Sequence, residues 1–198
     1  MAAGFLTIFI LLFSSLDSIA NSNLTIHMFQ HIGLFVGGIM FGYGLEKFLI
    51  TRLLYLKKKS FALWRAFTGV MKINSRTKGF AFVLVLPTLV FAYWHVPTFF
   101  DAAVTNPFVH ITEHLSYIIT GSLVGLSISA VTKRWRWVLM YLGFMQAGMM
   151  GSMWILWPSY FPVYSAAQNI QMGTALMLFG ALGVLLLSSQ LLKALDII

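Results

Sequence analysis

The sequence contains no cysteine, and only 9% of its 198 residues are charged. Without cysteine the chain can form no disulfide, no thiolate zinc or iron–sulfur site, and no c-type haem attachment. An ordinary soluble domain carries about 25% charged residues, so the composition excludes that class. The 59% hydrophobic content and the mean hydropathy of +0.85 exclude a disordered chain. The composition therefore indicates an integral membrane protein.

Long apolar stretches predict six membrane-spanning helices, because one span needs about 20 mostly apolar residues. The predicted spans are 4–20, 26–50, 79–96, 107–130, 137–157 and 169–192. The apolar–polar alternation of membrane β-strands is missing, so the predicted fold class is an all-α, polytopic membrane helix bundle. The first stretch has no positive residue before its apolar run, which favours a retained helix over a cleaved signal peptide. We expect 1–198 to form a single integral membrane domain.

The positive charges are confined to alternate connections between the predicted spans. Nine of the 13 lysines and arginines lie between residues 47 and 78, whereas 21–25, 97–106 and 158–168 hold none. The positive-inside bias then places both termini in the cytoplasm, in a multi-pass protein of the cell membrane. Topology and lipid headgroups account for the net charge of +8, so nucleic acid is not an expected partner. Residues 61–73 form either an interfacial helix or a solvated loop.

All five histidines fall near the outer ends of predicted spans. They are His27, His31, His95, His110 and His114. The pairs His27/His31 and His110/His114 are spaced i, i+4, which puts both rings of a pair on one helix face. At 1.5 Å rise per residue, His114 lies only about 10 Å below the start of its span. We therefore expect imidazoles from three helices to share one band on the extracytoplasmic side, where they could bind a metal ion.

Three of the five acidic residues fall in the same band, namely Asp17, Asp101 and Glu113. Carboxylates beside imidazoles commonly orient the ring through its second nitrogen, so these are candidate supporting groups of a metal site. The alternative for each histidine is an ordinary interfacial residue, and Asp101 could instead cap a helix or turn.

Methionines and one enzyme motif offer other readings of the sequence. Met145, Met149 and Met153 are spaced i, i+4 and could hold Cu(I), although methionine in a membrane helix is mostly filler. Residues 110–114 (HITEH) match the HxxEH pattern of inverted zinc peptidases. That motif would begin a lipid-spanning helix in a chain with almost no soluble domain, so we do not expect an enzyme.

Several motifs occur in the order seen in one known family. They are Ser15-Leu16-Asp17, His27-Met28-Phe29-Gln30-His31, Trp94-His95-Val96-Pro97, Phe100-Asp101-Ala102-Ala103, His110-Ile111-Thr112-Glu113-His114 and Gln168-Asn169-Ile170-Gln171-Met172-Gly173. Together they resemble the signatures of the CtaG-type cytochrome c oxidase assembly factor superfamily, and the chain is most similar to its short, archaeal branch. The chain departs from the pattern at Gln168 and Gln171, where the family has Asp-Gln-Gln, and at Gly37-Gly38, which replace a proline-containing stretch.

The resemblance implies a membrane protein that handles copper during assembly or metallation of a copper-containing respiratory oxidase. It would make the five histidines the metal site, and its partners would be membrane oxidase subunits or another copper enzyme. Imidazole also suits zinc and iron, so copper in particular depends on the resemblance. Two alternatives stay open: a b-type haem-binding cytochrome, since haem can be held by histidines from two helices, and a non-catalytic subunit of a larger membrane oxidase or monooxygenase complex. A homo-oligomer is possible.

Overall fold

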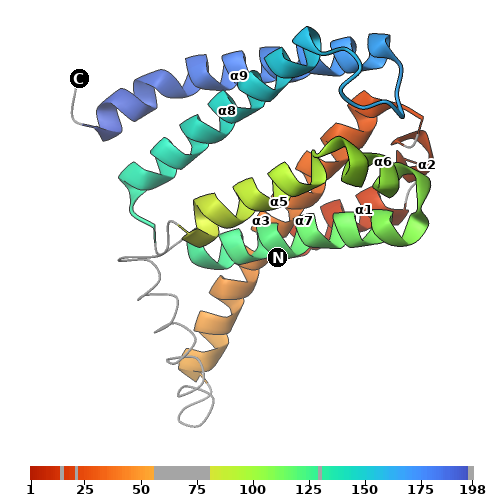
Figure 1. The fold of residues 1–198 in the computed structure, drawn as a ribbon. Helices are drawn as coiled ribbons and strands as arrows, with labels where there is room; N and C mark the ends of the chain where they lie inside the picture. The colour runs from red at the N-terminus through yellow and green to blue at the C-terminus, as the bar shows by residue number, and fades with distance from the viewer. Residues whose placement is uncertain (14–15, 21, 56–80, 129–130, 196–198) are drawn as a thin grey trace. The chain divides into compact units, whose positions relative to one another are not determined.

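The computed structural model of the chain is helical throughout its described part, which contains no β-strand (Figure 1). The structure describes all residues except 14–15, 21, 56–80, 129–130 and 196–198. The helices are α1 (Ala2–Phe13), α2 (Leu16–Ala20), α3 (Leu24–Tyr55), the π-helical turn η2 (Ala81–Val85), α5 (Leu86–Trp94), α6 (Pro97–Thr105), α7 (Pro107–Ile128), α8 (Lys133–Leu156) and α9 (Ala166–Ala194). The predicted all-α class is confirmed.

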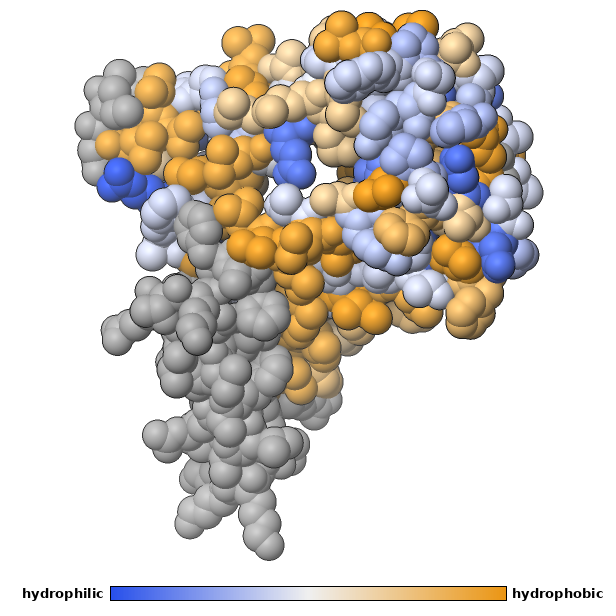
Figure 2. Space-filling model, viewed as in Figure 1, coloured by the Kyte–Doolittle hydropathy of each residue, from blue (hydrophilic) through white to orange (hydrophobic). Residues whose placement is uncertain are grey.

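Three of the described helices are long and apolar enough to cross a membrane. They begin at Leu24, Lys133 and Ala166, and a fourth span results if the pair Val83–Trp94 and Pro97–Thr105 counts as one. Figure 2 shows hydrophobic side chains over much of α8 and α9, and more hydrophilic ones around the loop that joins them. On α9, Leu185 is 73% exposed. Such apolar exposure suits contact with lipid rather than water.

Helices lie in all six stretches that the sequence predicted as spans, although only the three or four named above meet the criteria of length and hydropathy. The predicted connection 97–106 contains a helix of its own, α6, which meets the preceding helix at an angle of 70°. Pro97 explains this start, because proline fits the first turn of a helix and forces the residue before it to be extended. The predicted interfacial segment 61–73 lies outside the described residues.

The chain divides into two compact units. The first comprises Met1–Ser14, His31–Tyr93 and Thr112–Val131, and the second comprises Ser15–Gln30, Trp94–Ile111 and Thr132–Ile198. Helices α3 and α7 each contribute residues to both units.

Within the first unit, glycines allow α3 and α7 to approach each other closely. A Cβ atom on Gly42 would collide with the backbone of Ser122, and one on Gly121 would collide with the carbonyl of Phe35. Small residues at such contacts are the usual device by which helices pack where water supplies no hydrophobic driving force. The two helices are therefore held together backbone to backbone.

Within the second unit, α8 and α9 lie side by side and use the same device (Figure 1). Gly151 lies against the carbonyl of Gly173, and Gly180 lies against the backbone of Gly148. Side-chain caps begin both helices: the Thr132 hydroxyl accepts from Trp135 N, and the Ser165 side chain accepts from Gln168 N.

Candidate metal centre

In the second unit, the first turns of two helices bring His27 and His110 together. Helix α3 begins after Asn23, whose side-chain oxygen accepts a hydrogen bond from Ile26 N at 3.1 Å. Helix α7 begins at Pro107, after Asn106, whose side-chain oxygen accepts one from Phe108 N at 2.9 Å. The two imidazole rings are 5.6 Å apart between centroids and meet edge to face at 77°, and both side chains are buried.

In the first unit, the next turns of the same two helices bring a second imidazole pair and a carboxylate together. The His31 and His114 rings are 5.4 Å apart between centroids. The Nε2 atom of His31 lies 3.4 Å from a carboxylate oxygen of Glu113. Glu113 is completely buried, and the two histidines are 1% and 3% exposed. Burying a carboxylate is costly without a partner charge or a metal ion, so these three residues form a candidate functional site.

Four of these side chains satisfy the geometry of a metal site. One possible ligand atom from each of His27, His110, Glu113 and His114 lies within 4.8 Å of the other three. Three of the four are on α7, where the spacing i, i+3, i+4 places them on one helix face. His31 is not in this group, but its side chain contacts Glu113, which is a member of the group. Three imidazoles and one carboxylate suit zinc, iron or copper.

His95, the fifth predicted ligand, packs among the same aromatic rings as His27, with its ring centroid 6.4 Å from that of Phe100 and 6.3 Å from that of Phe161. Its ring stacks on Trp154 in the second unit, with the centroids 5.8 Å apart and the planes 12° apart. It is buried at 7% exposure, and its carbonyl accepts a hydrogen bond from the Tyr160 hydroxyl at 3.1 Å. It is not among the four residues whose ligand atoms converge.

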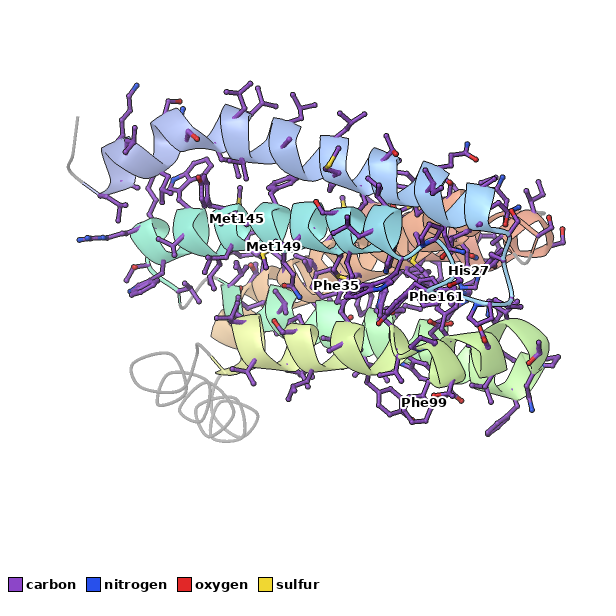
Figure 3. The ribbon with its side chains drawn as sticks, turned by 45° about the horizontal axis from the view of Figure 1, so that its top comes forward. His27, Phe35, Phe99, Met145, Met149 and Phe161 are labelled. Carbon is purple, nitrogen blue, oxygen red and sulfur yellow. The ribbon has the colours of Figure 1, made fainter. Side chains whose placement is uncertain are left out.

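The remaining predicted residues lie in three different places. Asp101 is on α6 and is not among the four residues whose ligand atoms converge. Asp17 belongs to the short helix α2, and its side chain is outside the described part of the chain. Met145 and Met149 are 43% and 70% exposed, along α8 in the second unit (Figure 3). The structure does not gather these two methionines into a buried thioether site.

Two tyrosines that sequence reasoning missed contact the imidazoles. In the second unit, the Tyr164 hydroxyl lies 3.1 Å from Nδ1 of His27. In the first unit, the Tyr117 ring packs on His31 with a centroid distance of 4.6 Å. Tyr117 is completely buried, and its hydroxyl has no hydrogen-bond partner among the described residues. Its position one turn after His114 on α7 could have indicated this contact, whereas nothing in the sequence near Tyr164 pairs it with His27.

The loop that carries Tyr164 is ordered by one buried amide. We call residues 157–165, between α8 and α9, the α8–α9 loop. Asn169 is fully buried at the start of α9, and its side chain accepts from Phe161 N and donates to Phe161 O, both at 3.2 Å. The same amide group donates to Ser165 O at 3.1 Å. Sequence reasoning noted Asn169 only as part of a motif, and the structure shows that it holds the loop.

Aromatic side chains pack the space between this loop and the imidazoles of the second unit. Phe161 is buried against Phe100 at 4.1 Å and against Trp154 at 5.1 Å between ring centroids. Phe100 in turn packs on His27 at 5.1 Å. Figure 3 shows His27 and Phe161 near the end of α8 that leads into the loop. His27 is therefore enclosed by apolar rings, which exclude water and strengthen electrostatic interactions with its nitrogen atoms.

Comparison with known proteins identifies a family for the whole chain. No curated protein and no solved structure gives a significant match. The sequence model of one family, described as a protein of unknown function (DUF1404), matches residues 2–195. The chain therefore belongs to the DUF1404 family.

Proposed function

We propose that this protein is a multi-pass membrane protein that binds a metal ion, copper in the first place, near the extracytoplasmic surface and helps to load a copper-containing respiratory oxidase. The observation that carries the proposal is the convergence of ligand atoms from His27, His110, Glu113 and His114 within 4.8 Å. All four side chains are buried in a chain whose charged residues are scarce. Ionisable groups at such places in membrane proteins are usually functional.

The choice of copper and of an oxidase client is supported by the motifs, not by the geometry. Histidine and carboxylate ligands suit Cu(II) and Zn alike. The converging residues are those of the HITEH and HMFQH motifs, which resemble the signatures of oxidase assembly factors. In this proposal six spans cross the membrane, both termini face the cytoplasm, and oxidase subunits are the partners.

A compact cluster favours a single ion over haem b. A haem iron takes its two axial ligands on opposite faces of a flat macrocycle. Here a carboxylate and three imidazoles each offer an atom to one small volume, and the His27 and His110 rings meet edge to face. Such a donor set resembles the sites of single transition-metal ions.

The test is elemental and optical analysis of protein purified in detergent without added metal. We expect about one ion per chain in the wild type, consistent with a single cluster of four ligands. His114→Ala should remove nearly all of it, because the site loses one ligand and leaves the Glu113 charge without its ion. His95→Phe is the matched control, since it removes an imidazole but keeps a ring against Trp154, and it should retain the ion.

Three results would contradict the proposal. Undiminished metal in His114→Ala would exclude the cluster as the binding site. A Soret band at stoichiometric haem would favour the cytochrome. Unchanged copper content of the respiratory oxidase in membranes of cells that lack this protein would exclude the proposed role in metallation.

A further inference from the structure

The hydrogen bonds of Tyr164 determine which nitrogen of His27 carries a proton. The Tyr164 hydroxyl donates to the carbonyl oxygen of Ala20 at 3.0 Å, and a carbonyl can only accept. A hydroxyl has one hydrogen, so at its 3.1 Å contact with Nδ1 of His27 it must accept. Nδ1 of His27 is therefore the donor. In a neutral imidazole this leaves the lone pair on Nε2.

From this geometry we infer that the α8–α9 loop sets His27 in its Nδ1–H tautomer through Tyr164, so that His27 offers Nε2 to the ion. The inference rests on the proposed metal site and assigns Tyr164 a role as a positioning residue. It names a hydroxyl, where sequence analysis expected a carboxylate such as Asp101. A metal-bound histidine commonly donates its other N–H group to a neighbouring acceptor, which fixes its ring and strengthens it as a ligand.

The loop is built to keep the Tyr164 hydroxyl in place. Asn169 fixes the loop backbone at Phe161 and at Ser165, on either side of Tyr164. Because the loop backbone is already fixed on both sides of Tyr164, ion binding does not incur the entropic cost of ordering this side chain.

Packing fixes the tyrosine ring as well as its backbone. The ring is 7% exposed and lies 6.0 Å from the Phe100 ring between centroids. The His27 and Tyr164 rings meet edge to face at 84°, with centroids 6.4 Å apart. A phenylalanine at position 164 would keep these ring contacts and remove only the hydroxyl, which makes Tyr164→Phe a clean test.

The chain also offers a matched control on the same loop. The Tyr160 hydroxyl donates to the carbonyl of His95 at 3.1 Å, and burial raises the pKa of this phenol above its ordinary value of 10.0. The hydroxyl therefore stays protonated at neutral pH. Tyr160→Phe removes one loop hydrogen bond of the same kind without touching an imidazole nitrogen.

The first measurement is the tautomer of His27 in the metal-free protein. Long-range ¹H–¹⁵N correlation of histidine-labelled protein in detergent distinguishes a protonated from an unprotonated ring nitrogen, and His27→Gln identifies the signals. We expect protonated Nδ1 and unprotonated Nε2 in the wild type and in Tyr160→Phe. Tyr164→Phe should lose this pattern and show an increased share of the other tautomer.

The second measurement is the affinity for Zn²⁺, used as a probe ion, by competition with a chromophoric chelator. Tyr164→Phe should bind Zn²⁺ about 10- to 100-fold more weakly than the wild type, as is typical when such a supporting partner is removed. Tyr160→Phe should stay close to the wild type. A general loosening of the loop would weaken both variants equally.

The outcomes separate this inference from the proposed function. Protonated Nε2 on His27 in the wild type would overturn the inference even if the protein binds metal, and so would equal Zn²⁺ affinities in the two variants. The expected tautomer in a wild-type protein that binds neither zinc nor copper would support the hydrogen-bond arrangement and overturn the metal site.

Discussion

The helix pairs α3–α7 and α8–α9 use the same packing device but carry different chemistry. In the first unit, Gly42 lies against the backbone of Ser122, and in the second unit, Gly180 lies against that of Gly148. The first turns of α3 and α7 carry four buried histidines and Glu113, whereas α8 carries none of the converging ligands.

The difference shows that close packing alone does not mark a functional site in this protein. For α3–α7, helix separation also sets the distance from His31 to Glu113 and His114, because the ligands belong to the same two helices. For α8–α9, we expect separation to affect stability only. The proposed contribution of this pair to the metal centre is made by Tyr164 in the α8–α9 loop.

The largest effect is expected from Gly42→Leu, which would force α3 and α7 apart. The added side chain meets backbone rather than a movable side chain, so a cost of about 3 kcal/mol in unfolding free energy, the upper end of the usual range, is expected. The variant should also lose its bound metal, because one ligand of the converging group is on α3 and the other three are on α7. Denaturant unfolding in detergent and elemental analysis measure the two quantities. Full metal content in a folded Gly42→Leu protein would show that helix separation does not control the site.

A smaller effect is expected from Gly180→Leu, the corresponding change in the other pair. Its side chain would meet the backbone of Gly148 and the carbonyl of Phe144, so we expect a loss of about 1–3 kcal/mol. Metal content per folded chain should match that of the wild type. If this variant loses metal as completely as Gly42→Leu, the two helix pairs do not differ as described.

The smallest effect is expected from Gly143→Ala, the matched control on α8. Apart from its own stretch of helix, no atom of the described residues lies within 4 Å of the position that its Cβ would take. Alanine is favoured over glycine within a helix by about 0.5–1 kcal/mol, so the free energy of unfolding should rise slightly. Metal content should not change. A clear destabilisation would indicate a partner surface at this position.

The sequence predicted the helical class and a helix in each of the six apolar stretches, but it did not predict α6, which lies in a stretch expected to be a connection. The i, i+4 spacing also predicted that His110 and His114 share one face of α7, whatever surrounds that helix. The stacking of His95 on Trp154 could not be predicted, because it joins residues 59 positions apart. The contact between Tyr164 and His27 spans 137 positions and was missed for the same reason.

The single carboxylate of the converging group has a consequence for its electrostatic balance. With Glu113 ionised and the imidazoles neutral, the four ligands carry one negative charge. A monovalent cation would neutralise this charge, whereas a divalent one would leave a net positive charge in surroundings of low dielectric constant, where desolvating an ion costs several kcal/mol. In the proposed metal site, charge balance would therefore favour a monovalent ion such as Cu(I) over a divalent ion such as Zn(II).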